Sequence, residues 1–475
     1  MTDFDFVSRL NSRSSIYPDG RVLDPTCCIV LQVAPEYVHR FETQVSLIVA
    51  ANLLSRMTPN LAFDIPDVPI HCALPWKNKT LLQIVKDESC LNRPDRINEI
   101  RPARKDDYIL NIGASGGNIN VHGSGWYAFV GSSSSPLPQQ DTLNPIGAAF
   151  AATMAVTLLF DIKPQPISYD YIFDAFKWKP ANGKFYDYPY TSFPFLGSLW
   201  FIGLGSVGSC ALYFLSLATR NFQPVLIDMD KVEIENMDRS AIFRAEHLGL
   251  YKVHAADIFL NSIGIEDSVK ETCSFSEANI RQHRQPGEPD VFISAANEQN
   301  VRYSIEQGMP PIQVYATTGN EWQTTLLRHI PLVDACSCCI FPPEKHVTET
   351  VCGGGKVENK ETGEKIDAAL PFLSFMAGLM TAAEILKMPL PGYPFTSNKV
   401  TFWASPKKRS PRFVDQIFKK KNGCVCQSRH KDIHQSMIAG SKFDSLSKND
   451  AYNKEENNIE VPKAVATNSV KELIG

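Results

Sequence analysis

Residues 199–209 read Leu-Trp-Phe-Ile-Gly-Leu-Gly-Ser-Val-Gly-Ser, and this stretch decides the fold. Its apolar first half predicts a buried strand, and Gly203, Gly205 and Gly208 form a Gly-x-Gly-x-x-Gly turn that opens a helix. Glycines at these positions let the backbone turn tightly and approach a phosphate at the helix N-terminus. The same turn is typical of dinucleotide sites, so an NAD-dependent oxidoreductase is one interpretation.

The polar residues that follow favour a different nucleotide. Asp228 and Asp230 come after the next apolar run, and Asn236, Arg239 and Lys252 come after them. An acidic side chain at the end of the second strand can bind ribose hydroxyls. Arginine can grip phosphate oxygens with two nitrogens, and lysine adds a point charge. Because Asn236 and Arg239 are three residues apart, a helix would present both on one side. Such cations are superfluous for hydride transfer, but they suit a whole ATP triphosphate.

The second half of the chain alternates strand and helix patterns. Strand-like runs occupy 199–202, 225–227, 291–294 and 313–316. This alternation predicts an α/β fold with a doubly wound, mostly parallel, Rossmann-like sheet.

The first half is harder to assign. Tyr108–Gly113 resembles a strand that runs into a glycine turn, and a helix of small residues follows over 148–160. No acidic pair and no Asn-x-x-Arg follow these glycines. Two interpretations stay open, an unrelated α/β domain or a degenerate copy of the nucleotide fold. We expect three regions, 1–185, 186–426 and a polar, disordered tail over 427–475.

Composition excludes several classes of protein. The 475 residues are 44% hydrophobic and 21% charged, with a net charge of −4 and a pI of about 6.2. This balance gives no basic footprint for nucleic acid. The apolar stretches near 148–160 and 368–383 are too short or interrupted to span a bilayer, so we expect core helices, no membrane contact and a cytoplasmic location.

The spacing of Asp228, Asn236, Arg239 and Lys252 behind the glycine turn resembles the ubiquitin-activating and ThiF/MoeB adenylyltransferase superfamily. The resemblance covers about 190–426. It implies that the glycines and Asp228 hold ATP and that Asn236, Arg239 and Lys252 bind the phosphates. It also implies that Mg²⁺ assists adenylation of the C-terminal carboxylate of a ubiquitin-like protein.

One position departs from the family pattern. A magnesium-binding aspartate is expected just after the strand 291–294, and Asn297 stands there instead, followed by Glu298. An amide oxygen can ligate Mg²⁺, but it binds more weakly without a charge. Adenylation is therefore either tolerant of this change or reduced.

The twelve cysteines predict thiol or metal chemistry rather than disulfides, because no secretory signal is evident. Separated short-spaced cysteine pairs are typical of a structural Zn²⁺ site. Supported by the resemblance, the expected ligands are Cys336, Cys339, Cys424 and Cys426, and Cys338 could replace one of them. The second pair is Cys-x-Cys rather than Cys-x-x-Cys, and unmetallated thiols are the alternative.

Cys352 lies in Val-Cys-Gly-Gly-Gly-Lys, a loop that can swing and whose Lys356 would favour the thiolate. The resemblance places the catalytic cysteine in a crossover loop, here about 345–368. It implies that Cys352 accepts the carrier protein as a thioester, with the polar insert 356–365 as a hinge.

The sequence thus predicts an enzyme that activates a ubiquitin-like protein and passes it to a conjugating enzyme. Its bipartite plan is similar to the activating enzymes of bacterial antiphage (Bil-type) operons, and family analogy suggests a homodimer. The alternatives are activation of a sulfur-carrier protein, as in ThiF and MoeB, and a degenerate scaffold without catalysis.

Overall fold

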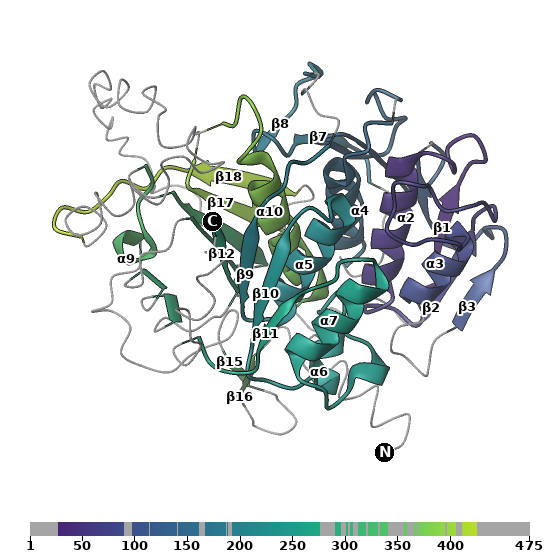
Figure 1. Cartoon of the computed structure of the whole chain (residues 1–475). Coiled ribbons are helices and arrows are strands. Elements are labelled where there is room, and N and C mark those ends of the chain that lie inside the picture. The colour runs from purple at the N-terminus through teal and green to yellow at the C-terminus, as the bar shows by residue number, and fades with distance from the viewer. Residues whose placement is uncertain are drawn as a thin grey trace.

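The computed structural model contains two halves, each built on one sheet (Figure 1). The described residues are 27–89, 97–113, 115–139, 141–160, 167–186, 188, 192–275, 290–295, 301–302, 305–306, 312–319, 322–330, 333–340, 356–358, 365–367, 370–394, 397–404 and 411–424.

The first half runs from β1 to β8. Its strands are β1 (Ile29–Val33), β2 (Asn60–Asp64), β3 (Ile97–Ile100), β4 (Tyr108–Ile112), β5 (Ile119–Ser124), β6 (Tyr127–Gly131), β7 (Asp170–Asp174) and β8 (Lys179–Pro180). Its helices are α2 (Phe41–Leu54), α3 (Leu81–Ser89) and α4 (Pro145–Leu159).

The second half runs from β9 to β18. Its strands are β9 (Ser198–Ile202), β10 (Gln223–Ile227), β11 (Val269–Glu271), β12 (Val291–Ser294), β13 (Gln313–Gly319), β14 (Gln323–His329), β15 (Lys356–Glu358), β16 (Lys365–Asp367), β17 (Lys399–Trp403) and β18 (Arg412–Gln416). Its helices are α5 (Ser206–Ala218), α6 (Ile234–Met237), the short 3₁₀ helix η1 (Ala245–His247), α7 (Lys252–Ser262), α9 (Ser337–Ile340) and α10 (Pro371–Lys387).

The two sheets share one topology over the described residues. The first has the strand order β3-β2-β1-β4-β5-β6-β7-β8, and the second has the order β11-β10-β9-β12-β13-β14-β17-β18. In each sheet the first five strands pair in parallel and the last three are added antiparallel. The predicted α/β class with a doubly wound, mostly parallel sheet is therefore confirmed.

The strand predicted at 108–113 is confirmed, but it does not occupy the central place that β9 has in the second sheet. The glycine-turn candidate at 108–113 is β4, which lies fourth along the sheet order, and β1 occupies the place that β9 has in the second sheet. Gln32 pairs with Asp64 at the end of β1, yet α2 begins only at Phe41, after a loop with no glycine. The tight turn of the second half is thus replaced by a longer connection.

Helices α2, α4, α5 and α10 lie between the two sheets and pack against one another (Figure 1). Every residue of α2 and α10 is buried, as is nearly all of α4. A helix that is apolar on all sides belongs in a protein interior. Asn144 caps α4 by accepting a hydrogen bond from Ile146 N at 3.0 Å, and prolines start both α4 and α10. The predicted core helices are confirmed.

Within the described residues, no helix combines the length and the apolar character that crossing a bilayer requires.

Candidate functional site

The glycine turn, Asp228 and the Asp230–Lys252 pair lie together at one edge of the second sheet. Strand β9 pairs with β10 on one side and with β12 on the other, so the chain changes direction across the sheet at this point. Open α/β sheets bind ligands at the carboxyl ends of strands beside such a switch point. The glycine turn follows β9, Asp228 follows β10 and Ala295 follows β12.

The three glycines of the turn meet three different structural demands. Gly203 has φ +88°, which a side chain would strain. A Cβ on Gly208 would lie 2.0 Å from Gly203 O, so only glycine lets α5 start this close to β9. A Cβ on Gly205 would meet nothing within 4 Å. The backbone at Gly205 therefore faces space that a phosphate can enter, next to the N-terminus of a 13-residue helix.

Asp228 is hydrogen-bonded to the backbone of this turn. Its carboxylate accepts hydrogen bonds from Leu204 N at 2.6 Å and from Asp230 N at 2.8 Å. Burial raises the pKa of Asp228 above its ordinary value, and Lys252 opposes that shift. Each carboxylate oxygen has a second lone pair, so Asp228 can still accept from ribose hydroxyls while it shapes the loop.

Lys252 brings a buried cation to the two aspartates. It is the first residue of α7, and its Nζ lies 2.7 Å from Asp230 Oδ2 and 4.0 Å from Asp228 Oδ1. The Lys252 side chain is 8% exposed, whereas that of Asp230 is 60% exposed. The lysine is therefore fixed in place, and its partner Asp230 is free to face solvent and a cation such as Mg²⁺.

Asn236 and Arg239 do not share one helix face as predicted. Helix α6 ends at Met237, and Asn236 caps its start by accepting from Glu233 N at 3.0 Å. Arg239 follows the helix, is 6% exposed, and its Nη1 donates to Asp238 Oδ1 at 2.9 Å. Asn236 therefore lies within the helix and Arg239 beyond its end, which the three-residue spacing could not indicate.

Two residues of the first half, neither singled out in the sequence analysis, contact the segment that carries Arg239. Arg56, two residues after the end of α2, donates to Met237 O and Ala241 O, and Asn52 of α2 donates to Ala241 O. These partners lie 181 to 189 positions apart in the chain. No local pattern links residues over such a separation, so sequence reasoning missed them.

Three of the four predicted metal ligands come together. The sulfurs of Cys336, Cys339 and Cys424 all lie within 4.8 Å of one another, with Cys336 Sγ 3.8 Å from Cys339 Sγ and 3.4 Å from Cys424 Sγ. Sulfurs around a tetrahedral Zn²⁺ are expected about 3.8 Å apart, since each Zn–S bond is about 2.3 Å. The set fits a zinc site that lacks its fourth ligand, and Cys426 lies outside the described residues.

A buried carboxylate holds the cysteine helix against the sheet. Glu306 accepts from Tyr315 Oη and from Ser337 N, each at 2.8 Å, and lies 3.2 Å from His329 Nδ1. Burial alone would raise the pKa of Glu306, but the pairing with His329 and these hydrogen bonds lower it to about 2. Glu306 is thus an anionic anchor for α9 that the sequence analysis did not single out.

Cys352, Asn297 and Glu298 also lie outside the described residues. The polar insert that follows Cys352 is bounded by β15 and β16, which pair antiparallel, Lys356 opposite Asp367. The segment predicted as a hinge thus has two paired ends.

Comparison with known proteins places this site in a family. Residues 198–426 match the ThiF family and form a ThiF-family domain. This ThiF-family domain coincides with the second sheet and includes every residue of the predicted nucleotide site.

Two curated relatives are similar to part of the chain. The adenylyltransferase and sulfurtransferase UBA4 of Candida albicans is 25% identical over 246 residues, which cover 50% of this chain and 52% of that protein. The adenylyltransferase and sulfurtransferase MOCS3 of Culex quinquefasciatus is 27% identical over 173 residues, or 35% of this chain and 38% of that protein. The matched residues thus span about half of the length of the UBA4 relative and less than half of the length of the MOCS3 relative.

Among solved structures, the crystal structure of E. coli MccB with ATP has a TM-score of 0.37 at 16% identity. The match covers 48% of this chain and 66% of that one.

Proposed function

We propose that this chain uses ATP to adenylate the C-terminal carboxylate of a ubiquitin-like protein. The observation that carries this proposal is the Gly203–Gly208 turn, open at Gly205, with Asp228, Asp230 and Lys252 gathered beside it. The named adenylyltransferase activity of two curated relatives of the ThiF-family domain supports it.

In the proposed reaction, a carboxylate oxygen of the carrier protein attacks the α-phosphorus of ATP. An acyl–phosphate bond forms, the bond to the leaving pyrophosphate breaks, and the product is an acyl-adenylate. Lys252 and Arg239 stabilise the charge that develops on the phosphate oxygens. Mg²⁺ would neutralise the triphosphate when bound, with the exposed Asp230 carboxylate and Asn297 as its candidate ligands.

The first test is calorimetric titration of the purified chain with MgATP and, separately, with NADH. We expect saturable MgATP binding that is at least tenfold weaker, but still measurable, in Arg239→Ala, and no binding of NADH. Binding of NADH without MgATP would instead assign the turn to redox chemistry. Binding of neither would leave a scaffold without catalysis as the better account.

The second step in our proposal is attack of the Cys352 thiolate on the adenylate, which releases AMP and forms a thioester. A conjugating enzyme would then accept the carrier. The relatives are also named sulfurtransferases, which favours a sulfur-carrier protein as the second candidate substrate. The two are separated by incubating the chain with MgATP and each class of carrier. A thiol-sensitive adduct that disappears in Cys352→Ala supports the ubiquitin-like route.

We also propose that Cys336, Cys339 and Cys424 bind Zn²⁺ together with Cys426. The metal would join α9 to the end of the domain and would do no chemistry. Purified protein should contain one zinc per chain by atomic emission, and Cys424→Ser should lower that content. Unchanged zinc in Cys424→Ser would contradict the assignment.

A further inference from the structure

Side chains of the first half donate hydrogen bonds to the backbone of residues 237–241, the segment that carries Arg239. Arg56 Nη2 and Asn52 Nδ2 each donate to Ala241 O at 3.1 Å, and Arg56 Nη1 donates to Met237 O. In addition, Cys210 Sγ of α5 donates to Arg239 O at 3.5 Å. Three alternate carbonyls, those of residues 237, 239 and 241, are therefore held in succession. This leaves the backbone on either side of Arg239 little freedom to move.

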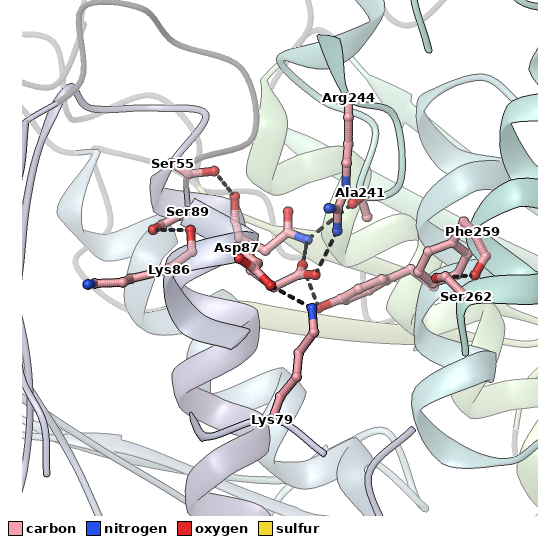
Figure 2. A network of polar contacts seen from close by, with 12 residues as sticks. Ser55, Lys79, Lys86, Asp87, Ser89, Ala241, Arg244, Phe259 and Ser262 are labelled. Carbon is pink, nitrogen blue, oxygen red and sulfur yellow. Dashed lines mark hydrogen bonds and ion pairs between the residues drawn. The ribbon is translucent and has the colours of Figure 1, made fainter. Parts of the chain in front are cut away.

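A buried carboxylate also links the two halves, in a network that includes Ala241 and Arg244 (Figure 2). Glu88 of α3 accepts hydrogen bonds from Asn52 Nδ2, from Arg244 Nη2 at 3.2 Å and from Tyr213 Oη at 3.5 Å. Asn52 and Glu88 belong to the first half, whereas Tyr213 and Arg244 belong to the second. The network therefore joins α2 and α3 to α5 and to the segment that follows Arg239.

The chemistry of Arg56 suits a positioning role. Its side chain is buried at 3% exposure, and its Nε also donates to Asn52 Oδ1 at 3.0 Å. Burial lowers the pKa of Arg56 to about 10, so it is still a cation at neutral pH. A planar guanidinium fixes several acceptors at once, which a lysine cannot do. Buried polar networks specify one arrangement of the chain more than they add stability, and apolar residues would fill this space at less cost.

We infer that Asn52 and Arg56 are positioning residues of the nucleotide site and set the place of Arg239 through the backbone of 237–241. The inference rests on the proposed function, in which Arg239 binds the phosphates of ATP. It gives the first half a defined task, which is to complete the geometry of a site that lies in the second half.

The test compares two ligands that differ in phosphate. The wild-type chain and Arg56→Met are titrated with MgATP and with adenosine. We expect Arg56→Met to weaken MgATP binding by about tenfold or more, the usual effect of losing a charge-assisted contact, and to leave adenosine binding within about twofold. The double variant Arg56→Met/Arg239→Ala should bind MgATP no more weakly than Arg239→Ala alone, because coupled residues are not additive.

Arg101→Met is the matched control. Arg101 is also a first-half arginine with a largely buried side chain, and it pairs with Asp107 and Glu99 at the edge strand β3. It should lower the melting temperature without changing MgATP affinity. Asn52→Ser, which keeps the Arg56 cation in place, provides a second variant if Arg56→Met does not fold.

The outcomes are separable. If the wild type binds MgATP and Arg239→Ala binds it more weakly, but Arg56→Met and Asn52→Ser bind like the wild type, the inference is overturned and the proposed function stands. If effects of Arg56→Met and Arg239→Ala simply add, Arg56 is structural and the inference is also overturned. If the wild type does not bind MgATP, the proposed function is wrong, and so is the inference that rests on it.

Discussion

At the scale of the residue, two glycines of the same turn have different roles, one in the stability of the fold and one in ligand binding. Gly208 is glycine because α5 and β9 approach too closely for a Cβ, whereas Gly205 faces open space. The same residue type is therefore required once for packing and once for access. Substitution should reveal this difference, since the two demands are measured by different experiments.

We predict that Gly205→Ala weakens MgATP binding by about tenfold while the free energy of unfolding changes by less than about 0.5 kcal/mol. An added Cβ at Gly205 meets no atom within 4 Å, so we expect little effect on packing. The new methyl group fills the space that the phosphate needs. Calorimetry and urea unfolding measure the two effects on the same samples.

Gly264→Ala is the control for this prediction. Gly264 has φ +77° and follows the C-terminus of α7. An alanine there should cost about 1 kcal/mol of stability and leave MgATP binding unchanged. Full MgATP affinity in Gly205→Ala would show that the phosphates do not approach this turn.

At the scale of the element, α5 and α10 pack so closely that their backbones are nearly in contact at Gly378. A Cβ on Gly378 of α10 would lie 2.4 Å from Cys210 Cβ and 2.5 Å from Ala211 N of α5. Small residues at such a crossing let two helices approach more closely than ridges of larger side chains allow. The position of α5, and with it the glycine turn at its N-terminus, depends on this contact.

We predict that Gly378→Ala lowers the free energy of unfolding by about 1–3 kcal/mol, because the added methyl must push two well-packed helices apart. Urea unfolding followed by circular dichroism measures the loss. Gly205→Ala is the matched comparison, since it makes the same chemical change where space is open. An unchanged unfolding midpoint for Gly378→Ala would contradict the close packing.

Elements with a strong local signal could be predicted from the sequence, and elements fixed by distant contacts could not. The run from Leu199 to Ser209 combines an apolar strand, a glycine turn and a helix start, and it forms all three. β1 has no such turn after it, so its place at the centre of the first sheet left no local trace. Arg56 and Glu306 acquire their roles only from partners that the fold brings to them.

At the scale of the whole molecule, the two halves share one interior. Helices from both halves form a single hydrophobic core, and the edge strands β8 and β18 are linked by Lys179 Nζ and Asp415 Oδ2 at 3.7 Å. Glu384 of α10 joins the halves more tightly. It accepts from Trp178 Nε1 of the first half at 2.9 Å and pairs with Lys387 and Arg328 at 2.9 Å each.

The Glu384 network predicts a dependence of stability on pH. Burial alone would raise the pKa of Glu384, but Lys387 and Arg328 lower it to about 2, from an ordinary value of 4.5. A carboxyl whose pKa is lowered by folding stabilises the protein fully above its unfolded pKa. That stabilisation is lost as pH falls through 4.5 toward 2. The loss is about 3 kcal/mol.

Urea unfolding of the wild type and of Glu384→Gln between pH 6 and 3 tests this prediction. The variant should be several kcal/mol less stable at pH 6, because it leaves two buried cations without their partner. Its stability should also fall less steeply toward acid than that of the wild type. Parallel curves for the two proteins would mean that Glu384 does not carry this part of the acid sensitivity.

The complete burial of α2 has a consequence for how the first half can evolve. All 14 of its residues are buried between elements of both halves, while the loop over 34–40 that replaces the glycine turn is largely exposed or half-buried. Mutational tolerance in this half should therefore be the reverse of that in a nucleotide-binding half. We expect the sequence of the loop 34–40 to vary among homologues. We expect α2, although it has no catalytic residue, to vary as little as an active site.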